Sequence, residues 1–249
     1  MNFEECKKVF EEFINNYDLN NEKINLKYLH TFRVVDFSEK IAKSLGLSNE
    51  DIEIAKVIGL LHDIGRFEQI KIYDTYDDSI SVNHAHLGVE ILKKDNYIDN
   101  YIKDEENKKI VLKTILEHNK LKIEDNLDRR TEMFCKLIRD ADKLDILEMF
   151  TKKIFIIEDN NEKISPKVLA SALSKKSVNN KDIITKMDYY INKISLVFDL
   201  NYPYSKQYVH DNEMITFIID ELIKKKEQEK DNLLLIKNIV ITYLSNKEV

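Results

Sequence analysis

The stretch IGLLHDIGRFEQ, residues 58–69, places His62 and Asp63 side by side directly after an apolar run. Gly65 and Arg66 follow within the next few residues, in a chain that has only six histidines and four glycines. An imidazole next to a carboxylate can simply end a helix, and it can also supply two ligands to a metal ion. The other histidines and aspartates of the chain decide between these interpretations.

The composition predicts an all-α protein. Hydrophobic residues make up 43% of the 249 residues and charged residues 34%, so a packed core under a charged surface is expected. Four glycines and two prolines are few for a turn-rich all-β fold. Apolar residues recur at helical spacing over residues 25–45, 81–95, 104–119 and 129–153, and no clear strand alternation is present.

Charge and cysteine content exclude several classes of protein. The net charge of −6 argues against a stable nucleic-acid complex, which would need a basic face. No run approaches 18 apolar residues, so no membrane span is expected. The acidic, amphipathic N-terminus does not resemble a signal peptide. Cys6 and Cys135 form neither a CxxC pair nor a disulfide framework, which favours a cytoplasmic protein.

Most of the histidines lie in one half of the chain. Five of the six fall between residues 30 and 118, and three aspartates follow in RDADKLD. Imidazole and carboxylate together suit Zn²⁺, Fe²⁺ or Mn²⁺, and an aspartate can bridge two such ions. His86 follows His84 by two residues, about 200° around a helix, so we expect a structural or supporting role for His86. His210 is expected to be unrelated to the cluster.

The order of these motifs resembles the HD-domain superfamily of metal-dependent phosphohydrolases. The resemblance rests on His30 in YLHTFRVVDFSEKIA, on His62 and Asp63 in LLHDIGR, and on Asp142 in DADKL. It covers roughly residues 25–150. The segments NHAHLGVEIL and EHNK resemble the subgroup that has two additional histidines.

The resemblance implies a helical bundle that holds one or two divalent ions of the Fe, Mn or Zn type, with Mg or Ni also allowed. The first ion would take His30, His62, Asp63 and Asp142. The second would take Asp63, His84 and His118. Some relatives with two metals have adjacent histidines where this chain has Glu117-His118. Glu117 could therefore be a ligand itself, or the acid that assists proton transfer.

Three arginines lie at helical spacing from the expected ligands. Arg33 follows His30 by three residues, Arg66 follows His62 by four, and Arg139 precedes Asp142 by three. On a helix such spacings place both residues on one face, so these guanidinium groups could neutralise an anionic substrate. Lys120 and Lys143 are further candidates. Equally, Arg139 could pair with a nearby acid, and the spacing of Arg66 requires the helix to continue past Gly65.

Residues 71–80, KIYDTYDDSI, are polar and rich in tyrosine and aspartate, which predicts a loop. Tyr73, Tyr76 and the acids Asp74, Asp77 and Asp78 could form a lid over the site. The same residues could equally form a plain surface connection.

We therefore expect an HD-type bundle over residues 20–155 and a helical extension over residues 156–249. The extension could close the pocket, dock on the bundle or form a homodimer interface. The expected function is hydrolysis of a small phosphorylated, nucleotide-like substrate, a phosphomonoester or phosphodiester, with Asp63, Arg66 and Glu117 as catalytic residues. The chain lacks the Gly-Tyr-Pro signature of cyclic-di-nucleotide phosphodiesterases. A di-iron oxygenase and a nucleotide-sensing regulatory module remain the alternatives.

Overall fold

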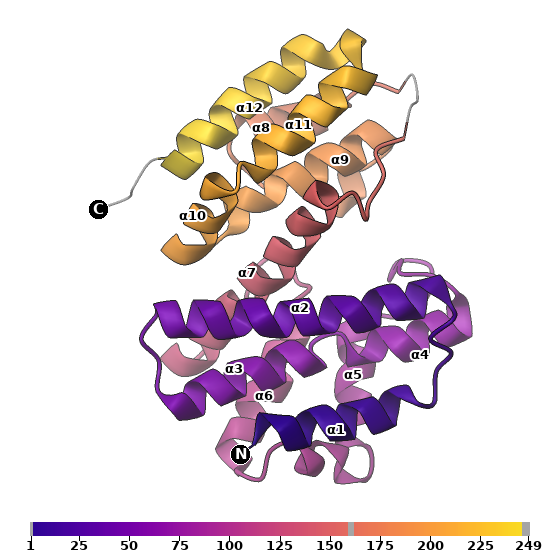
Figure 1. Ribbon diagram of the computed structural model, residues 1–249, viewed down its shortest axis with the longest axis vertical. Coiled ribbons are helices and arrows are strands. Elements are labelled where there is room, and N and C mark those ends of the chain that lie inside the picture. Colours follow the sequence, from indigo (N-terminus) through magenta and orange to yellow (C-terminus); the bar gives the residue numbers. More distant parts are fainter. Residues whose placement is uncertain (1, 159–161, 246–249) are drawn as a thin grey trace. The chain divides into compact units, whose positions relative to one another are not determined.

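A computed structural model describes residues 2–158 and 162–245, and these residues form helices and no strand (Figure 1). The all-α prediction is confirmed. The α-helices are α1 (Phe3–Ile14), α2 (Glu22–Ser44), α3 (Asn49–Leu61), α4 (Ile64–Tyr73), α5 (His84–Lys93), α6 (Glu105–Glu117), α7 (Arg129–Thr151), α8 (Pro166–Leu173), α9 (Lys186–Ser195), α10 (Pro203–Asp211), α11 (Met214–Lys225) and α12 (Lys230–Ser245). None of these described helices combines the length and the apolar character that crossing a membrane requires.

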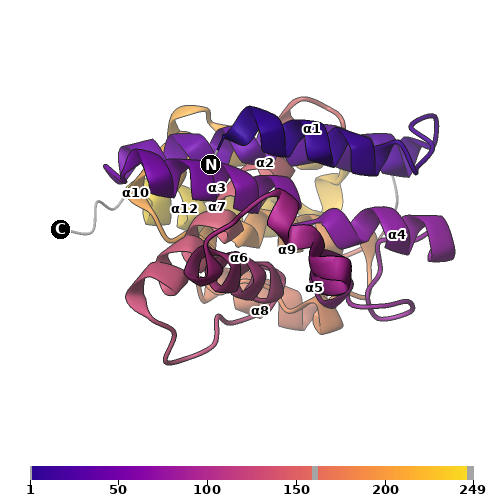
Figure 2. The same ribbon diagram turned by 90° about the horizontal axis from the view of Figure 1, so that it is seen from below.

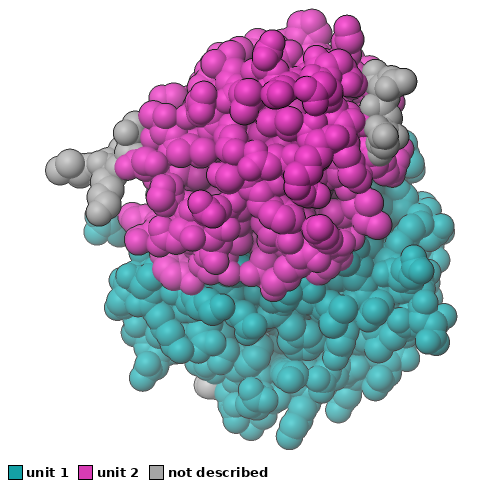
Figure 3. Space-filling model, turned by 45° about the horizontal axis from the view of Figure 1, so that its top comes forward, with its two compact units in different colours: residues 1–142 teal, residues 143–249 magenta. Residues whose placement is uncertain are grey.

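The chain divides into two compact units, residues 1–142 and 143–249 (Figure 3). The division falls inside α7, earlier than the boundary at residue 155 that the sequence suggests. Unit 1 also includes α1, which lies before the expected start at residue 20. The reason is that Phe10 of α1 is fully buried, with its ring centroid 6.1 Å from that of Phe32 and 5.9 Å from that of Phe67.

Side-chain caps begin α2 and α3 of unit 1, and a glycine lies where the two helices pack. The Asn21 side chain accepts hydrogen bonds from the first backbone N–H groups of α2, and the Ser48 hydroxyl caps α3 as its position before an apolar run predicts. Gly59 of α3 lies against the backbone of Val35 in α2, where an added Cβ would approach within 3.1 Å of the Val35 Cα. The two helices can therefore pack at close range.

Gly65 has the same function between α4 and α5, which lie side by side in unit 1 (Figure 2). A Cβ added at Gly65 would overlap the carbonyl oxygen of His84 and the backbone nitrogen of Gly88. The start of α5 therefore rests directly on the backbone of α4, two residues after Asp63. This contact explains the glycine in the stretch 58–69.

Unit 2 is a separate bundle of helices in which α12 contacts α8, α10 and α11. Pro166 begins α8 after Ser165, and Pro203 begins α10, since proline fits the first turn of a helix. Asp188 near the start of α9 completes a capping box with Thr185 and also binds Ser165. A buried carboxylate thus joins the starts of α8 and α9.

Candidate metal centre

The six side chains predicted as metal ligands come together inside unit 1. They come from α2 (His30), the junction between α3 and α4 (His62 and Asp63), the first residue of α5 (His84), the residue that follows α6 (His118) and the middle of α7 (Asp142). The four histidines and Asp63 are at most 7% exposed. A histidine-rich stretch of sequence therefore becomes one buried cluster.

The two carboxylate oxygens of Asp63 face different pairs of histidines. Oδ2 lies 3.6 Å from His30 Nε2 and 3.5 Å from His62 Nε2. Oδ1 lies 3.3 Å from His84 Nε2 and 3.5 Å from His118 Nε2. Within each of the two groups, all the candidate ligand atoms lie within 4.8 Å of one another. One carboxylate thus serves two sets of imidazoles, which is the arrangement that bridging of two ions requires.

Asp142 extends the first of these groups, because its Oδ1 lies 3.2 Å from His30 Nε2. Burial opposes ionisation of Asp142, but the hydrogen bond and charge of His30, followed by His62, hold its pKa well below the ordinary value. Burial also opposes ionisation of Asp63, and Lys27 and His62 are the largest of the influences that lower its pKa. Both groups are therefore carboxylates at neutral pH, the form that a cation binds.

Three of the imidazoles have their Nδ1–H group engaged away from Asp63. His62 Nδ1 donates to a backbone carbonyl one turn earlier in α3 at 2.8 Å, and His118 Nδ1 does the same in α6 at 2.6 Å. His84 Nδ1 lies 2.6 Å from a carboxylate oxygen of Asp78, which accepts. In its neutral form, each of these rings has a lone pair on Nε2, the atom that faces Asp63.

The protonation states support this assignment for two of the rings. Burial disfavours the charged ring and lowers the pKa of His62 to about 4, although Asp63 opposes the shift. Burial likewise lowers the pKa of His84 to about 4, against the effect of the Asp78 hydrogen bond. Both rings are therefore neutral at pH 7.

The spacing of the lone pairs fits a divalent cation. The Nε2 atoms of His84 and His118 lie only 3.0 Å apart, although both rings donate through Nδ1. His62 Nε2 is buried and has no hydrogen-bond partner among the described residues. Atoms that bind one ion at about 2.0–2.2 Å lie roughly 3.0–3.5 Å apart when the bonds are at 90–110°. A cation in each group would satisfy atoms that otherwise oppose one another.

Lys27 is a charged member of the cluster to which the sequence motifs do not point. Its Nζ lies 2.6 Å from Asp63 Oδ2, and its side chain is 19% exposed. Lys27 precedes His30 by three residues in α2, so both side chains lie on one face of the helix. That spacing is the signal that could have identified it.

Arg66, predicted to bind substrate and to act in catalysis, has several protein partners. Its NH1 group donates to Gln69 Oε1 at 2.6 Å and to the Tyr76 carbonyl and Asp78 Oδ1 at 2.7 Å. Its Nε lies 3.7 Å from Asp63 Oδ1. The guanidinium therefore connects the cluster with the loop that follows α4, and a contact with substrate stays a prediction.

Arg139 also contacts backbone carbonyl groups. Its NH1 donates to His118 O at 3.4 Å and to Lys120 O, and its NH2 donates to Leu121 O at 3.3 Å. These carbonyl groups lie just after α6, where the helix dipole favours a cation. Arg139, which is 5% exposed, thereby supports the segment that carries His118.

The other predicted substrate contacts also stay predictions. Arg33 is half-buried on α2. Lys120 Nζ donates to Glu117 Oε1 at 2.7 Å. Lys143, assigned to unit 2, pairs with Asp199 of the same unit at 2.8 Å.

Glu117 is buried in an environment that keeps it ionised. Its carboxylate pairs with Lys113 at 3.0 Å and Lys120 at 2.7 Å, and it accepts from the backbone N–H of Glu124 at 3.0 Å. Burial would raise the pKa of Glu117, but these partners outweigh it and lower the pKa to about 2. Glu117 belongs to neither group of clustered ligand atoms. The structure thus gives no support to Glu117 as a general acid at neutral pH.

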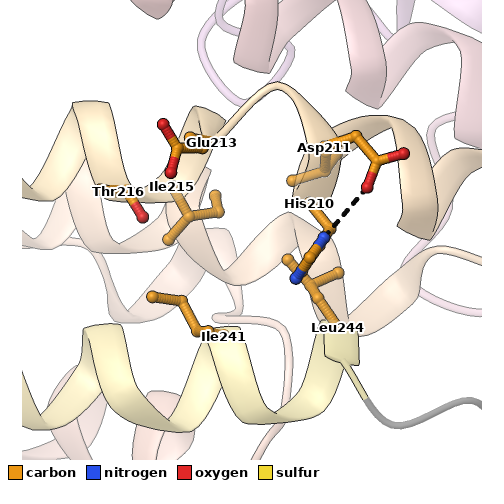
Figure 4. Close-up of a pocket in the computed structure, with 8 residues that line it drawn as sticks. His210, Asp211, Glu213, Ile215, Thr216, Ile241 and Leu244 are labelled. Atoms are coloured by element: carbon orange, nitrogen blue, oxygen red, sulfur yellow. Dashed lines mark hydrogen bonds and ion pairs between the residues drawn. The ribbon is translucent and has the colours of Figure 1, made fainter.

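The remaining histidines lie outside the cluster. His86 is exposed, in line with its expected position around the helix from His84. His210 and Asp211, 3.1 Å apart, line a pocket of unit 2 between the start of α11 and the end of α12 (Figure 4). The polar side chains that line this pocket are exposed or partly exposed. We assign no chemistry to it.

Comparison with known families identifies the part of the chain that carries the cluster. Residues 28–149 match the family model of the HD domain. No curated protein and no solved structure matches the chain. The matched range contains all six predicted ligands, so the resemblance inferred from the motifs is confirmed. Residues 28–149, just under half of the chain, are therefore identified as an HD domain.

Proposed function

We propose that this protein hydrolyses a phosphomonoester or phosphodiester of a small, nucleotide-like substrate. The observation that carries the proposal is Asp63, whose two oxygens face two separate pairs of imidazoles. This geometry is suited to paired cations, a common device for displacement at phosphorus. The family supports metal-dependent hydrolysis in general, and the substrate class is our inference.

The residues that would hold the ions fall into two sets that share Asp63. One set is His30, His62, Asp63 and Asp142, and the other is Asp63, His84 and His118. When bound there, divalent ions supply a water of lowered pKa and positive charge beside the phosphoryl oxygens. The protein contributes imidazole nitrogens and ionised carboxylates that already face one another, so little rearrangement is needed.

Lys27 is the cationic side chain best placed to assist. Its ammonium group contacts Asp63 and is partly exposed to solvent. An ammonium at the edge of the cluster can neutralise a phosphoryl oxygen as a compact charge. Because Glu117 is held ionised by Lys113 and Lys120, we do not assign the protonation of the leaving group to it.

The test begins with the whole chain purified without chelator or oxygen. Bound metal is measured by elemental analysis. Phosphate release is then measured from nucleoside mono-, di- and triphosphates, and phosphodiester cleavage is followed by chromatography of cyclic and dinucleotide substrates. Asp63→Asn is the test variant, and Asp36→Asn, an exposed aspartate in α2, is the control.

We expect metal-dependent hydrolysis in the wild type and the control, and its loss in Asp63→Asn. Full metal occupancy without hydrolysis of any substrate would refute the proposal. Oxygen consumption by the iron-loaded protein would favour the oxygenase alternative. Tight nucleotide binding by the metal-loaded protein without turnover would favour a regulatory module.

A further inference from the structure

The loop between α4 and α5, residues 74–83, folds back onto α4 and is held there by two side chains. Arg66 NH1 donates to Asp78 Oδ1 at 2.7 Å, and Gln69 Nε2 donates to the same oxygen at 2.9 Å. Gln69 is fully buried. Its Nε2 also donates to the Ser81 hydroxyl at 2.8 Å and to the Val82 carbonyl at 2.9 Å.

The held loop places Asp78 against a predicted metal ligand. Asp78 Oδ2 lies 2.6 Å from His84 Nδ1, and Asn119 Nδ2 donates to the same oxygen at 3.3 Å. Both carboxylate oxygens of Asp78 are therefore engaged, one by the ligand and one by the side chains that hold the loop. An imidazole that donates to a carboxylate through one nitrogen is oriented to bind a metal through the other.

His84 depends on this loop in a way that two other ligands do not. His62 and His118 each follow a helical turn, and each donates to a carbonyl group three residues earlier, Gly59 and Ile115 respectively. Those bonds form whenever the helix forms. His84 is the first residue of α5 and has no preceding turn to supply a carbonyl group. The loop supplies its partner instead.

We propose that Asp78 is a positioning residue for His84, and that the loop 74–83, held by Arg66 and Gln69, determines the affinity of the second cation group. The group concerned is Asp63, His84 and His118. The inference rests on the proposed function, because it requires the cluster to bind divalent ions. It assigns Arg66 to the support of a ligand, in place of the substrate contact predicted from its spacing.

The experiment titrates chelator-treated full-length protein with Mn²⁺ alone and follows free Mn²⁺ by electron paramagnetic resonance. The wild type is expected to bind two ions. Asp78→Ala should weaken the second by about 10–100-fold, the usual effect of losing a partner of a metal-binding histidine, and leave the first within about twofold. Asp78→Asn, which keeps the size of the side chain and one acceptor oxygen, should fall between these values.

The neighbouring Asp77 provides a matched control. It lies in the same loop, is exposed and bonds to Ser79. Asp77→Asn removes the same charge and should leave both Mn²⁺ affinities unchanged. Arg66→Gln should also weaken the second ion, because Arg66 holds Asp78 and its Nε lies 3.7 Å from Asp63 Oδ1. A residue that only contacts substrate would instead raise KM and leave Mn²⁺ binding unchanged.

Each outcome separates this inference from the proposed function. The role of Asp78 would be overturned if Asp78→Ala bound both ions with the affinities of the wild type, or if both affinities fell equally. If circular dichroism shows that Asp78→Ala does not fold, Asp78→Asn is judged by the same criteria. A wild type that binds one ion refutes the inference and leaves metal-dependent hydrolysis intact. Two bound ions without hydrolysis would overturn the proposed function alone.

Discussion

Asp63 in unit 1 and Asp188 in unit 2 are both buried aspartates, yet their partners differ in kind. Asp188 accepts hydrogen bonds from the Ser165 hydroxyl at 2.6 Å and from the backbone N–H groups of Ser165, Ile184 and Thr185. Asp63 contacts the ammonium group of Lys27, lies 3.7 Å from the Arg66 guanidinium, and also faces imidazole nitrogens that include bare lone pairs.

The difference teaches how a structural carboxylate can be told from a functional one. Burial would raise the pKa of Asp188, but hydrogen bonds from Ser165 and from backbone N–H groups lower it. Its partners are all donors of the chain itself, so its acceptor capacity is used without a ligand. Asp63 also contacts Lys27 and Arg66, but the imidazole Nε2 atoms that face it include acceptors, which a cation would satisfy. The partners of a buried aspartate, and not its burial, indicate its role.

The largest expected effect is that of Asp63→Asn on metal binding and turnover. A bound metal contributes several kcal/mol to the stabilisation of the transition state, so its loss should reduce turnover by at least about a hundredfold. In metal-free protein the new amide can donate to an imidazole lone pair but loses the ion pair with Lys27, so the free energy of unfolding should fall by about 1–2 kcal/mol. Elemental analysis and urea unfolding measure the two effects. If Asp63→Asn retained the metal content of the wild type, Asp63 would not be the functional carboxylate of the comparison.

Asp188→Asn should produce the opposite pattern. The amide places N–H groups among N–H donors and removes charge-assisted hydrogen bonds, so we expect unfolding in urea to lose about 1.5–3 kcal/mol. Metal content should remain that of the wild type, because Asp188 belongs to neither group of candidate ligands. A variant that is as stable as the wild type would show that Asp188 is not the structural counterpart of Asp63.

Gly65→Ala tests the packing beneath the second group of ligands. The new Cβ meets the backbone of His84 and Gly88, which cannot move as a flexible side chain would. Such overpacking should cost about 1–3 kcal/mol in urea unfolding. It should also weaken the second Mn²⁺ ion more than the first, because His84 is displaced. If the affinities for the two ions changed by the same factor relative to the wild type, α4 and α5 would have separated without moving His84.

The most gradual effect is the response of the metal-free protein to mild acid. His62 and His84, with pKa values of about 4 in the folded protein, bind protons more readily when unfolded, where their pKa is about 6.5. Their stabilising contribution is complete above pH 6.5 and should decline by roughly 1–2 kcal/mol per pH unit as the pH falls towards 4.5. The contribution of Asp188 is lost only below its ordinary pKa of 3.8.

Hydrogen exchange of the metal-free protein at pH 7, 6 and 5 measures this difference. After correction for intrinsic exchange rates, amide protection should decrease in α3 and α5 before it decreases in α9. Equal losses in the two units would show that the histidines are charged, or that the units unfold together.

The helices and the histidine cluster are predictable from sequence for local reasons. Apolar periodicity predicts α2, α6 and α7 within a few residues, because each has one strongly buried face. The ligand set follows from the order of motifs, and the structure brings those residues together. Lys27 escapes notice because a lysine three residues from a histidine is common on helix surfaces.

The arginines show where sequence reasoning stops. Spacing on a helix predicts the face on which Arg66 and Arg139 lie, and both do lie near candidate ligands. It cannot predict which distant groups fill that space. The partners of Arg66 belong to a loop that folds back after α4, and those of Arg139 belong to the segment after α6. These contacts depend on tertiary structure, as does the contact between Asp78 and His84.

The fixed tautomers of His62 and His84 have a calorimetric consequence. Metal binding to histidine ordinarily displaces a proton, which the buffer takes up with its own heat of ionisation. Here both rings are neutral near pH 7 and keep their single N–H on Nδ1, turned away from Asp63. Neither ring has a proton to give up to an incoming cation. The heat of Mn²⁺ binding measured in PIPES and in Tris, whose ionisation heats differ widely, should therefore contain no contribution from proton release by these two ligands.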